Sequence, residues 1–208
     1  ALWPAPLSGS AFWYSQLTQT AALYGVACLS GLLVRHSGVR VNYTRKINHF
    51  ALFFVPIFLR DAFAFEGTPA TYLAGRLIFA GVLGTYVEPI RSRVPVVALM
   101  FASFDRPEDR PHTLAWLTTQ TIAGYLVLIP LLMALTDLGM PELVYIPILI
   151  NAVGGGWAEP VGARFGRHRY SVTALFTDRK FTRSIEGSAC VFIAGIVVAS
   201  LVSRVWRS

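Results

Sequence analysis

Two short segments near the C-terminus combine glycines, carboxylates and arginines in a pattern that suits a phosphorylated ligand. The first, residues 154–168, begins with three successive glycines, continues through Glu159 and ends in a group of cations. The second, residues 183–189, reads Arg-Ser-Ile-Glu-Gly-Ser-Ala. Successive glycines let the backbone approach a ligand and point its N–H groups at phosphate oxygens. Arginine suits the same ligand because its planar guanidinium donates two hydrogen bonds to phosphate.

Each motif also has an ordinary structural interpretation. Glycines in membrane helices often permit close packing between helices. Basic loops often contact anionic lipid headgroups. For any one motif taken alone, both interpretations stay open.

The composition is typical of an integral membrane protein. Of the 208 residues, 54% are hydrophobic and 14% are charged, and the mean hydropathy is +0.54. These values exclude an ordinary soluble domain. Cys28 and Cys190 lie far apart within apolar runs, so we expect them to pack rather than form a disulfide or a metal site. Because the sequence begins at Ala1, we expect either a removed leader or a missing N-terminal part.

The apolar runs predict an all-α transmembrane bundle of about six spans in a single membrane domain, residues 1–208. The expected spans lie near 12–34, 47–64, 70–90, 113–136, 141–161 and 185–203. The apolar segment 94–104 is too short to span and reads as interfacial or re-entrant. Basic residues fill the odd connections and acidic residues the even ones, the alternation that the positive-inside rule demands. The longest polar connection is the loop 162–183.

Three motifs in order resemble the CTP-dependent lipid kinases. They are Arg45-Lys46-Ile47-Asn48-His49, the glycine-rich segment with Arg164-Phe165-Gly166, and the segment 183–189. The family comprises phytol kinases, dolichol kinases and yeast-type diacylglycerol kinases, and it is related to membrane cytidylyltransferases. The similarity runs from about Arg45 to about Gly195, and Gly154–Gly166 is most similar to the phytol kinase form.

The resemblance implies an enzyme that moves the γ-phosphoryl group of CTP, with Mg²⁺, onto the hydroxyl of an isoprenoid or other lipid alcohol. Carried over residue by residue, it predicts three groups of site residues. The nucleotide-binding group is Gly154, Gly155, Gly156, Arg164, Arg167, Arg169, Arg45, Lys46, Arg183 and Ser184. The catalytic group is Glu159, Glu186 and His49, and Glu159 is also the expected metal ligand.

The sequence departs from the family pattern in two places. Gly155 stands where the family usually has a metal-binding aspartate, although Glu159 lies one helical turn further on the same face. A single apolar stretch follows the Glu-Gly-Ser segment, where phytol kinases continue further. Both departures favour an alternative function, a non-catalytic subunit of a larger membrane complex or a lipid-binding scaffold.

The expected partners are membrane lipids and, for the alternative, other membrane subunits; no nucleic acid is expected. The lipid, the nucleotide preference and the membrane stay open. An organellar membrane and a bacterial inner membrane both suit a multi-pass protein of this kind.

The charge alternation predicts the topology. We expect residues 35–46 and 162–183 to share one face of the membrane, while 61–69 and 137–142 share the other. Single cysteines placed near Arg40 and near Arg169 can be labelled in sealed vesicles with an impermeant maleimide. Labelling of these two positions from opposite sides contradicts the six-span arrangement.

Overall fold

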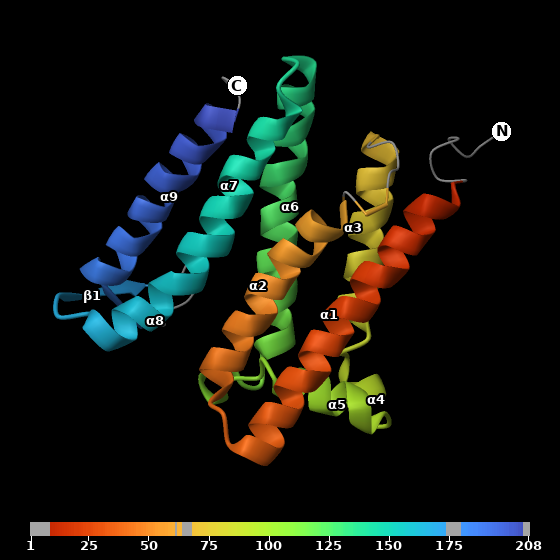
Figure 1. The fold of residues 1–208 in the computed structure, drawn as a ribbon. Helices are drawn as coiled ribbons and strands as arrows, with labels where there is room; N and C mark the ends of the chain where they lie inside the picture. The colour runs from red at the N-terminus through yellow and green to blue at the C-terminus, as the bar shows by residue number, and fades with distance from the viewer. Residues whose placement is uncertain (1–8, 61, 64–67, 174–179, 206–208) are drawn as a thin grey trace. The chain divides into compact units, whose positions relative to one another are not determined.

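A computed structural model describes residues 9–60, 62–63, 68–173 and 180–205, and the chain is mostly helical (Figure 1). The chain divides into two compact units, Ala1–Met133 and Ala134–Ser208. The single membrane domain expected from the sequence stays a prediction.

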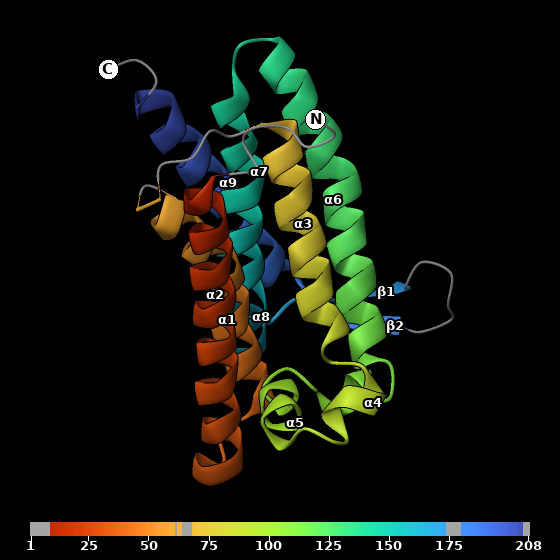
Figure 2. The same cartoon turned by 90° about the vertical axis from the view of Figure 1, so that its right-hand side faces the viewer.

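Helices build the described part of the first unit. They are α1 (Ser10–Ser37), α2 (Val41–Arg60), α3 (Pro69–Gly84), the short α4 (Glu88–Arg91), α5 (Pro95–Ala102), the 3₁₀ turn η2 (Pro107–Asp109) and α6 (Thr113–Asp137), which runs past the unit boundary. In Figure 2, α4 and α5 lie together at one end of α3. The eight-residue α5 agrees with the short, non-spanning segment expected at 94–104.

Two helix boundaries differ from the prediction. Helix α1 ends at Gly38, which adopts φ 63° and donates its N–H to the Leu33 carbonyl oxygen. The connection that follows is so short that Arg45 already lies within α2 rather than in a basic loop. Helix α3 ends at Gly84, so it is shorter than the span expected over 70–90.

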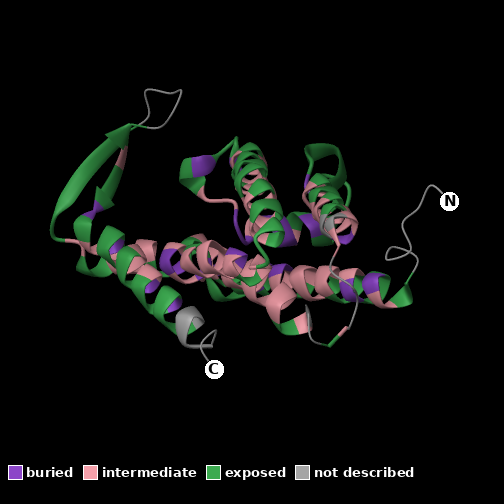
Figure 3. Cartoon of the chain, turned by 90° about the horizontal axis from the view of Figure 1, so that it is seen from above, coloured by how far each residue is buried: buried purple, intermediate pink, exposed green. Residues whose placement is uncertain are grey.

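The first unit has a small aromatic core at one end. Its buried residues are Ala27, Tyr86, Val97, Met100, Phe101 and Phe104. The Phe104 ring meets the rings of Tyr86 and Phe101 edge-on, with centroids 5.1 and 5.3 Å apart. Helices α1 and α5 pack closely here because Gly31 has no side chain to separate them. Most other helical residues are half-buried or exposed (Figure 3).

Among the described residues, two helices are long and apolar enough to cross a membrane, α1 and α6. None of the most apolar 18-residue window of α6 is buried within the chain. Leu126 is 71% exposed there. So much exposed apolar surface calls for a lipid environment or a protein partner, and it fits the expected membrane association.

The second unit is a helical pair joined by a β-hairpin. After α6, the chain passes through η3 (Pro141–Val144), α7 (Tyr145–Leu149), the π-helical η4 (Ile150–Gly155) and α8 (Gly156–Phe165), and then through β1 (Arg169–Thr173), β2 (Lys180–Ser184) and α9 (Ile185–Val205). The strands pair antiparallel, with Arg169 opposite Ser184 and Thr173 opposite Lys180. The connection 162–183, expected as a loop, therefore contains a two-stranded sheet. Residues Arg169–Thr173 and Lys180–Ser184 form this sheet because their backbone N–H and C=O groups pair across the two strands.

The contact between α1 and α5 predicts opposite effects for two glycines of α1. A methyl group at Gly31 would lie 2.2 Å from the Leu99 carbonyl oxygen. We expect Gly31→Ala to lower the free energy of unfolding by about 1–3 kcal/mol. Gly25 has nothing within 4 Å of the same position, so Gly25→Ala should raise it by about 0.5–1 kcal/mol.

Unfolding in mixed detergent micelles, followed by circular dichroism, measures both variants. Equal effects of the two substitutions would contradict the close packing of α1 on α5.

Candidate functional site

The predicted site residues fall into both units. Arg45, Lys46 and His49 belong to α2 in the first unit. The others belong to the second unit, on η4, α8, the hairpin and the first turn of α9.

The three successive glycines are helical and do not form the turn expected for phosphate binding. Gly154 and Gly155 end η4, and Gly156 begins α8. The Gly156 N–H is directed at the carbonyl oxygens of Ala152 and Val153, so the helix uses it. A methyl group at Gly154 would lie 3.0 Å from the Val191 Cα atom. The role of Gly154 visible in the second unit is close packing against α9.

Two more glycines bring α8 and α9 into backbone contact. A methyl group at Gly187 would lie 2.7 Å from the Ala158 carbonyl oxygen, and one at Gly162 would lie 2.6 Å from the Ser184 Oγ atom. Ser184 is buried, and its hydroxyl accepts the Gly187 N–H at 3.1 Å. This residue, expected to bind nucleotide, caps the N-terminus of α9.

Glu186 ties the start of the hairpin to α9. Its Oε1 atom accepts the Arg167 N–H at 3.1 Å and the His168 N–H at 3.2 Å, and it lies 2.9 Å from His168 Nδ1. The Glu186 residue precedes the apolar part of α9, which begins at Ala189. Its own backbone amide, then the His168 ring and the two loop amides, lower the pKa of the carboxyl to about 2. At neutral pH Glu186 is therefore an ionised acceptor and not a proton donor.

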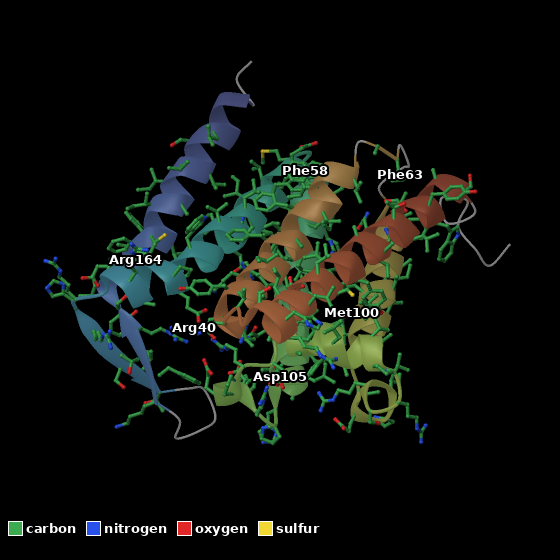
Figure 4. The ribbon with its side chains drawn as sticks, turned by 60° about the horizontal axis from the view of Figure 1, so that its bottom comes forward. Arg40, Phe58, Phe63, Met100, Asp105 and Arg164 are labelled. Carbon is green, nitrogen blue, oxygen red and sulfur yellow. The ribbon has the colours of Figure 1, made fainter. Side chains whose placement is uncertain are left out.

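Four arginines lie on α8, the hairpin and the connection between them. Arg164, Arg167, Arg169 and Arg183 are exposed. Arg164 lies at the end of α8, where Figure 4 labels it, with its guanidinium 5.7 Å from the Phe165 ring centroid. No described carboxylate forms an ion pair with any of these four side chains. We call these four residues the arginine cluster.

Glu159 and His49 are the remaining catalytic candidates. Glu159 is half-buried on α8. The His49 ring packs edge-on against Phe53, with centroids 5.0 Å apart. Among the described residues, no three histidine, cysteine, aspartate or glutamate side chains come together as a metal site. Glu159 is therefore not part of such a group among the described residues, and the Mg²⁺ that the resemblance implies stays a prediction.

In the first unit, Arg45 belongs to a partly buried ion-pair network. Its Nη1 atom lies 2.6 Å from Asp109 Oδ2, and Arg106 Nε lies 2.8 Å from the same oxygen. Burial raises the pKa of Asp109, but the hydrogen bonds and charges of Arg106 and Arg45 outweigh burial and hold the pKa below its usual value. The segment 105–110 thus pairs with a cation predicted to bind nucleotide.

Neutral hydrogen bonds join the same two segments beside this ion pair. The Thr44 hydroxyl donates to the Ser103 carbonyl oxygen at 2.7 Å, and the Asn48 amide donates to the Ser103 hydroxyl at 3.0 Å. Thr44 and Ser103 are both fully buried. Within the first unit, this part of the Arg45–His49 motif holds α2 against the segment that follows α5. The sequence carried no signal for it, since Ser103 and Asp109 lie far from α2 along the chain.

A small cavity of about 320 Å³ opens beside this network. Its lining includes Glu88, Arg91, Ser92, Phe101 and Asp105. Arg91 pairs with Glu88, and its guanidinium lies 4.2 Å from the Phe101 ring centroid. The cavity therefore offers a cation that is already neutralised, unlike the arginine cluster.

Comparison with known protein families, curated proteins and solved structures finds no match to this chain. The resemblance to the CTP-dependent lipid kinases therefore stays a prediction.

The position of Asp109 predicts a pH-dependent contribution to stability. Because its pKa is lowered on folding, the contribution is complete above about pH 5 and is lost as the pH falls below about 4, the usual aspartate value. We expect Asp109→Asn to lower the free energy of unfolding at pH 7 by about 1.5–3 kcal/mol, and by less at pH 3.

Glu108→Gln is the control, since its carboxylate is 56% exposed and lies 3.8 Å from Arg106. Urea unfolding in micelles at several pH values measures both variants. A loss at pH 3 as large as that at pH 7 would show that the ion pairs do not stabilise the fold.

Proposed function

We propose that this chain is a multi-pass membrane protein with about six crossings, in the manner of the CTP-dependent lipid kinases. The apolar, unburied α6 and the long α1 support membrane crossing directly. Two shorter apolar helices, Leu73–Gly84 and Ile185–Leu201, are also described. Within α9 the proposed crossing begins at Ala189, after the hydrogen-bonded first turn.

We propose that the arginine cluster binds the phosphate chain of CTP. The observation that carries this proposal is its open charge: four exposed arginines lie on α8, the hairpin and the connection between them, and the nearby carboxylate of Glu186 accepts from backbone amides and lies beside His168. A di- or triphosphate supplies phosphate oxygens, and one arginine side chain can donate two parallel hydrogen bonds to such a group. The glycines serve this site indirectly, since they let α8 and α9 approach and so hold the cluster in place.

The reaction proposed for this site is phosphoryl transfer from CTP to the hydroxyl of a lipid alcohol. Such transfer depends mainly on positioning and on neutralising phosphate charge, and arginines at a membrane face suit both tasks. Since the described side chains form no ready Mg²⁺ site, no step is assigned to the metal. Glu159 is the carboxylate proposed to stand in for the missing aspartate at position 155.

A second function, that of a non-catalytic membrane subunit or lipid-binding scaffold, has its own support. The helical glycine segment packs against α9, and Gly155 brings no carboxylate to it. A protein that has lost phosphoryl transfer but retains the fold would keep this packing of the glycine segment against α9.

Equilibrium binding of labelled CTP to the protein in nanodiscs tests the site. We expect Arg167→Gln to weaken binding by about tenfold, because each charged hydrogen bond to phosphate is worth about 1.5–3 kcal/mol. The matched control is Arg93→Gln, an exposed arginine of the first unit. Equal effects of the two variants, or no CTP binding by the unaltered protein, would remove the proposed site.

Transfer of labelled phosphate to phytol, dolichol or diacylglycerol in the same nanodiscs separates the two functions. For an enzyme, Glu159→Gln abolishes transfer, whereas Gly155→Asp preserves or raises it. A scaffold shows no transfer with any of these lipids, and Glu159→Gln changes only its stability.

A further inference from the structure

The β1–β2 hairpin has one predominantly apolar face. Neighbouring residues of a strand point to opposite faces, while directly opposed residues of two strands share a face. Tyr170 is opposite Arg183, and Val172 is opposite Phe181. These four side chains therefore share one face, with Tyr170 41% and Val172 42% exposed. The Phe181 ring also supports the Arg183 guanidinium, 5.3 Å from its centroid.

The opposite face of the hairpin is polar and cationic. It carries Arg169, Ser171 and Thr173 from β1 and Lys180 and Thr182 from β2, all of them exposed. An isolated two-stranded hairpin is at best marginally stable in water. A hairpin with this division of side chains gains stability when its apolar face lies against a second surface.

The start of β1 lies next to the first turn of α9, just before the apolar part of that helix. The Ile185 N–H donates to the His168 carbonyl oxygen at 2.9 Å, and the Tyr170 hydroxyl lies 2.7 Å from the Ser188 hydroxyl. Ser188 immediately precedes the apolar part of α9. In Figures 2 and 3, both strands run sideways from the α8 and α9 pair rather than along it. If α9 crosses a bilayer, the strands extend along the bilayer surface.

We propose that the hairpin is an interfacial anchor that lies on an anionic leaflet, the one at which α9 enters the membrane. Tyr170, Val172 and Phe181 lie at the boundary between headgroups and acyl chains, where apolar side chains are buried. The tyrosine ring also suits this boundary because its hydroxyl group is polar. Arg183, on the same face, extends its charged end to the lipid phosphates. Charge complementarity selects the anionic leaflet, because Arg169 and Lys180 add two further cations within reach of its surface potential.

This inference rests on the proposed membrane crossing of α9 but not on CTP binding. Binding of a free nucleotide or of soluble phosphate does not account for the apolar face formed by Tyr170, Val172 and Phe181, because these ligands are polar anions. Contact with a membrane surface does account for it. Arg164 and Arg167, which lie outside the strands, belong to the proposed nucleotide site alone, whereas Arg169 and Arg183 take part in both proposals.

Fluorescent probes on single cysteines of the full chain test the anchor. Cys28 and Cys190 are first replaced by serine or alanine, and Val172→Cys, Ser171→Cys and Ile196→Cys are then labelled separately with an environment-sensitive dye. Each protein is reconstituted in vesicles of phosphatidylcholine and phosphatidylglycerol. Quenching by a nitroxide on the lipid is compared with quenching by aqueous iodide.

The expected result is lipid quenching at Val172→Cys and at Ile196→Cys, with iodide quenching at Ser171→Cys. In the Val172→Cys background, replacing Arg169 or Lys180 with glutamine should lower the ratio of docked to undocked hairpin by about fivefold for each cation removed. Vesicles of phosphatidylcholine alone should lower the same ratio.

Ile196, which is 52% exposed on α9, distinguishes failure of the anchor from failure of the membrane crossing. Lipid quenching at Ile196→Cys with none at Val172→Cys overturns the anchor and leaves the crossing intact. Absence of quenching at both positions overturns the crossing and the anchor together. Equal quenching at Val172→Cys and Ser171→Cys, or shielding of both from lipid and iodide as a protein partner would produce, also overturns the anchor.

Discussion

The second unit depends on the backbone contact between α8 and α9. Gly162 and Gly187 have no side chains, so the Ser184 hydroxyl and the Ala158 carbonyl occupy the space where Cβ atoms would otherwise stand. That contact brings the end of one helix next to the start of the other. Glu186 can then reach the amides of Arg167 and His168, and the hairpin between the helices closes with its arginines on the outside. Packing therefore determines the electrostatics of this unit.

Two buried or partly buried carboxylates organise the charges of the chain in different ways. Asp109 binds the side chains of two arginines, so its single negative charge is shared between both cations. Glu186 instead binds backbone amides and one imidazole, so its charge is not paired with a neighbouring arginine. Both carboxylates are stabilised in the ionised form, and among the described residues the arginines near Glu186 have no carboxylate ion-pair partner. This difference is why the proposed phosphate site lies in the second unit.

The sequence was most informative where hydrophobicity decides the structure. The apolar runs predicted the positions of α1, α6 and α9, and the length of the segment at 94–104 predicted a short α5. Contacts between distant residues were not predictable: Arg45 and Asp109 are 64 positions apart, and no local pattern pairs them. The hairpin was missed because its strands are short and carry polar residues on one side, which reads as a loop. The glycines were recognised, but composition alone could not decide between ligand binding and helix packing.

The π-helical segment η4 lets the chain carry one extra residue before α8 without changing the face that α8 presents. A π turn accommodates one residue more than an α turn, and the wider turn takes up the extra residue, so the side chains before and after it keep the directions of a regular helix. Each residue of a regular helix, by contrast, advances the direction of its side chain by about 100°. Removing one residue from Ile150–Gly155 would therefore return η4 to a regular helix and leave Gly162 facing Ser184. Removing one residue from the regular helix between Gly156 and Gly162 would instead turn Gly162 away from Ser184 by about that angle. The face of α8 that meets α9 thus depends on where along the helix a residue is lost.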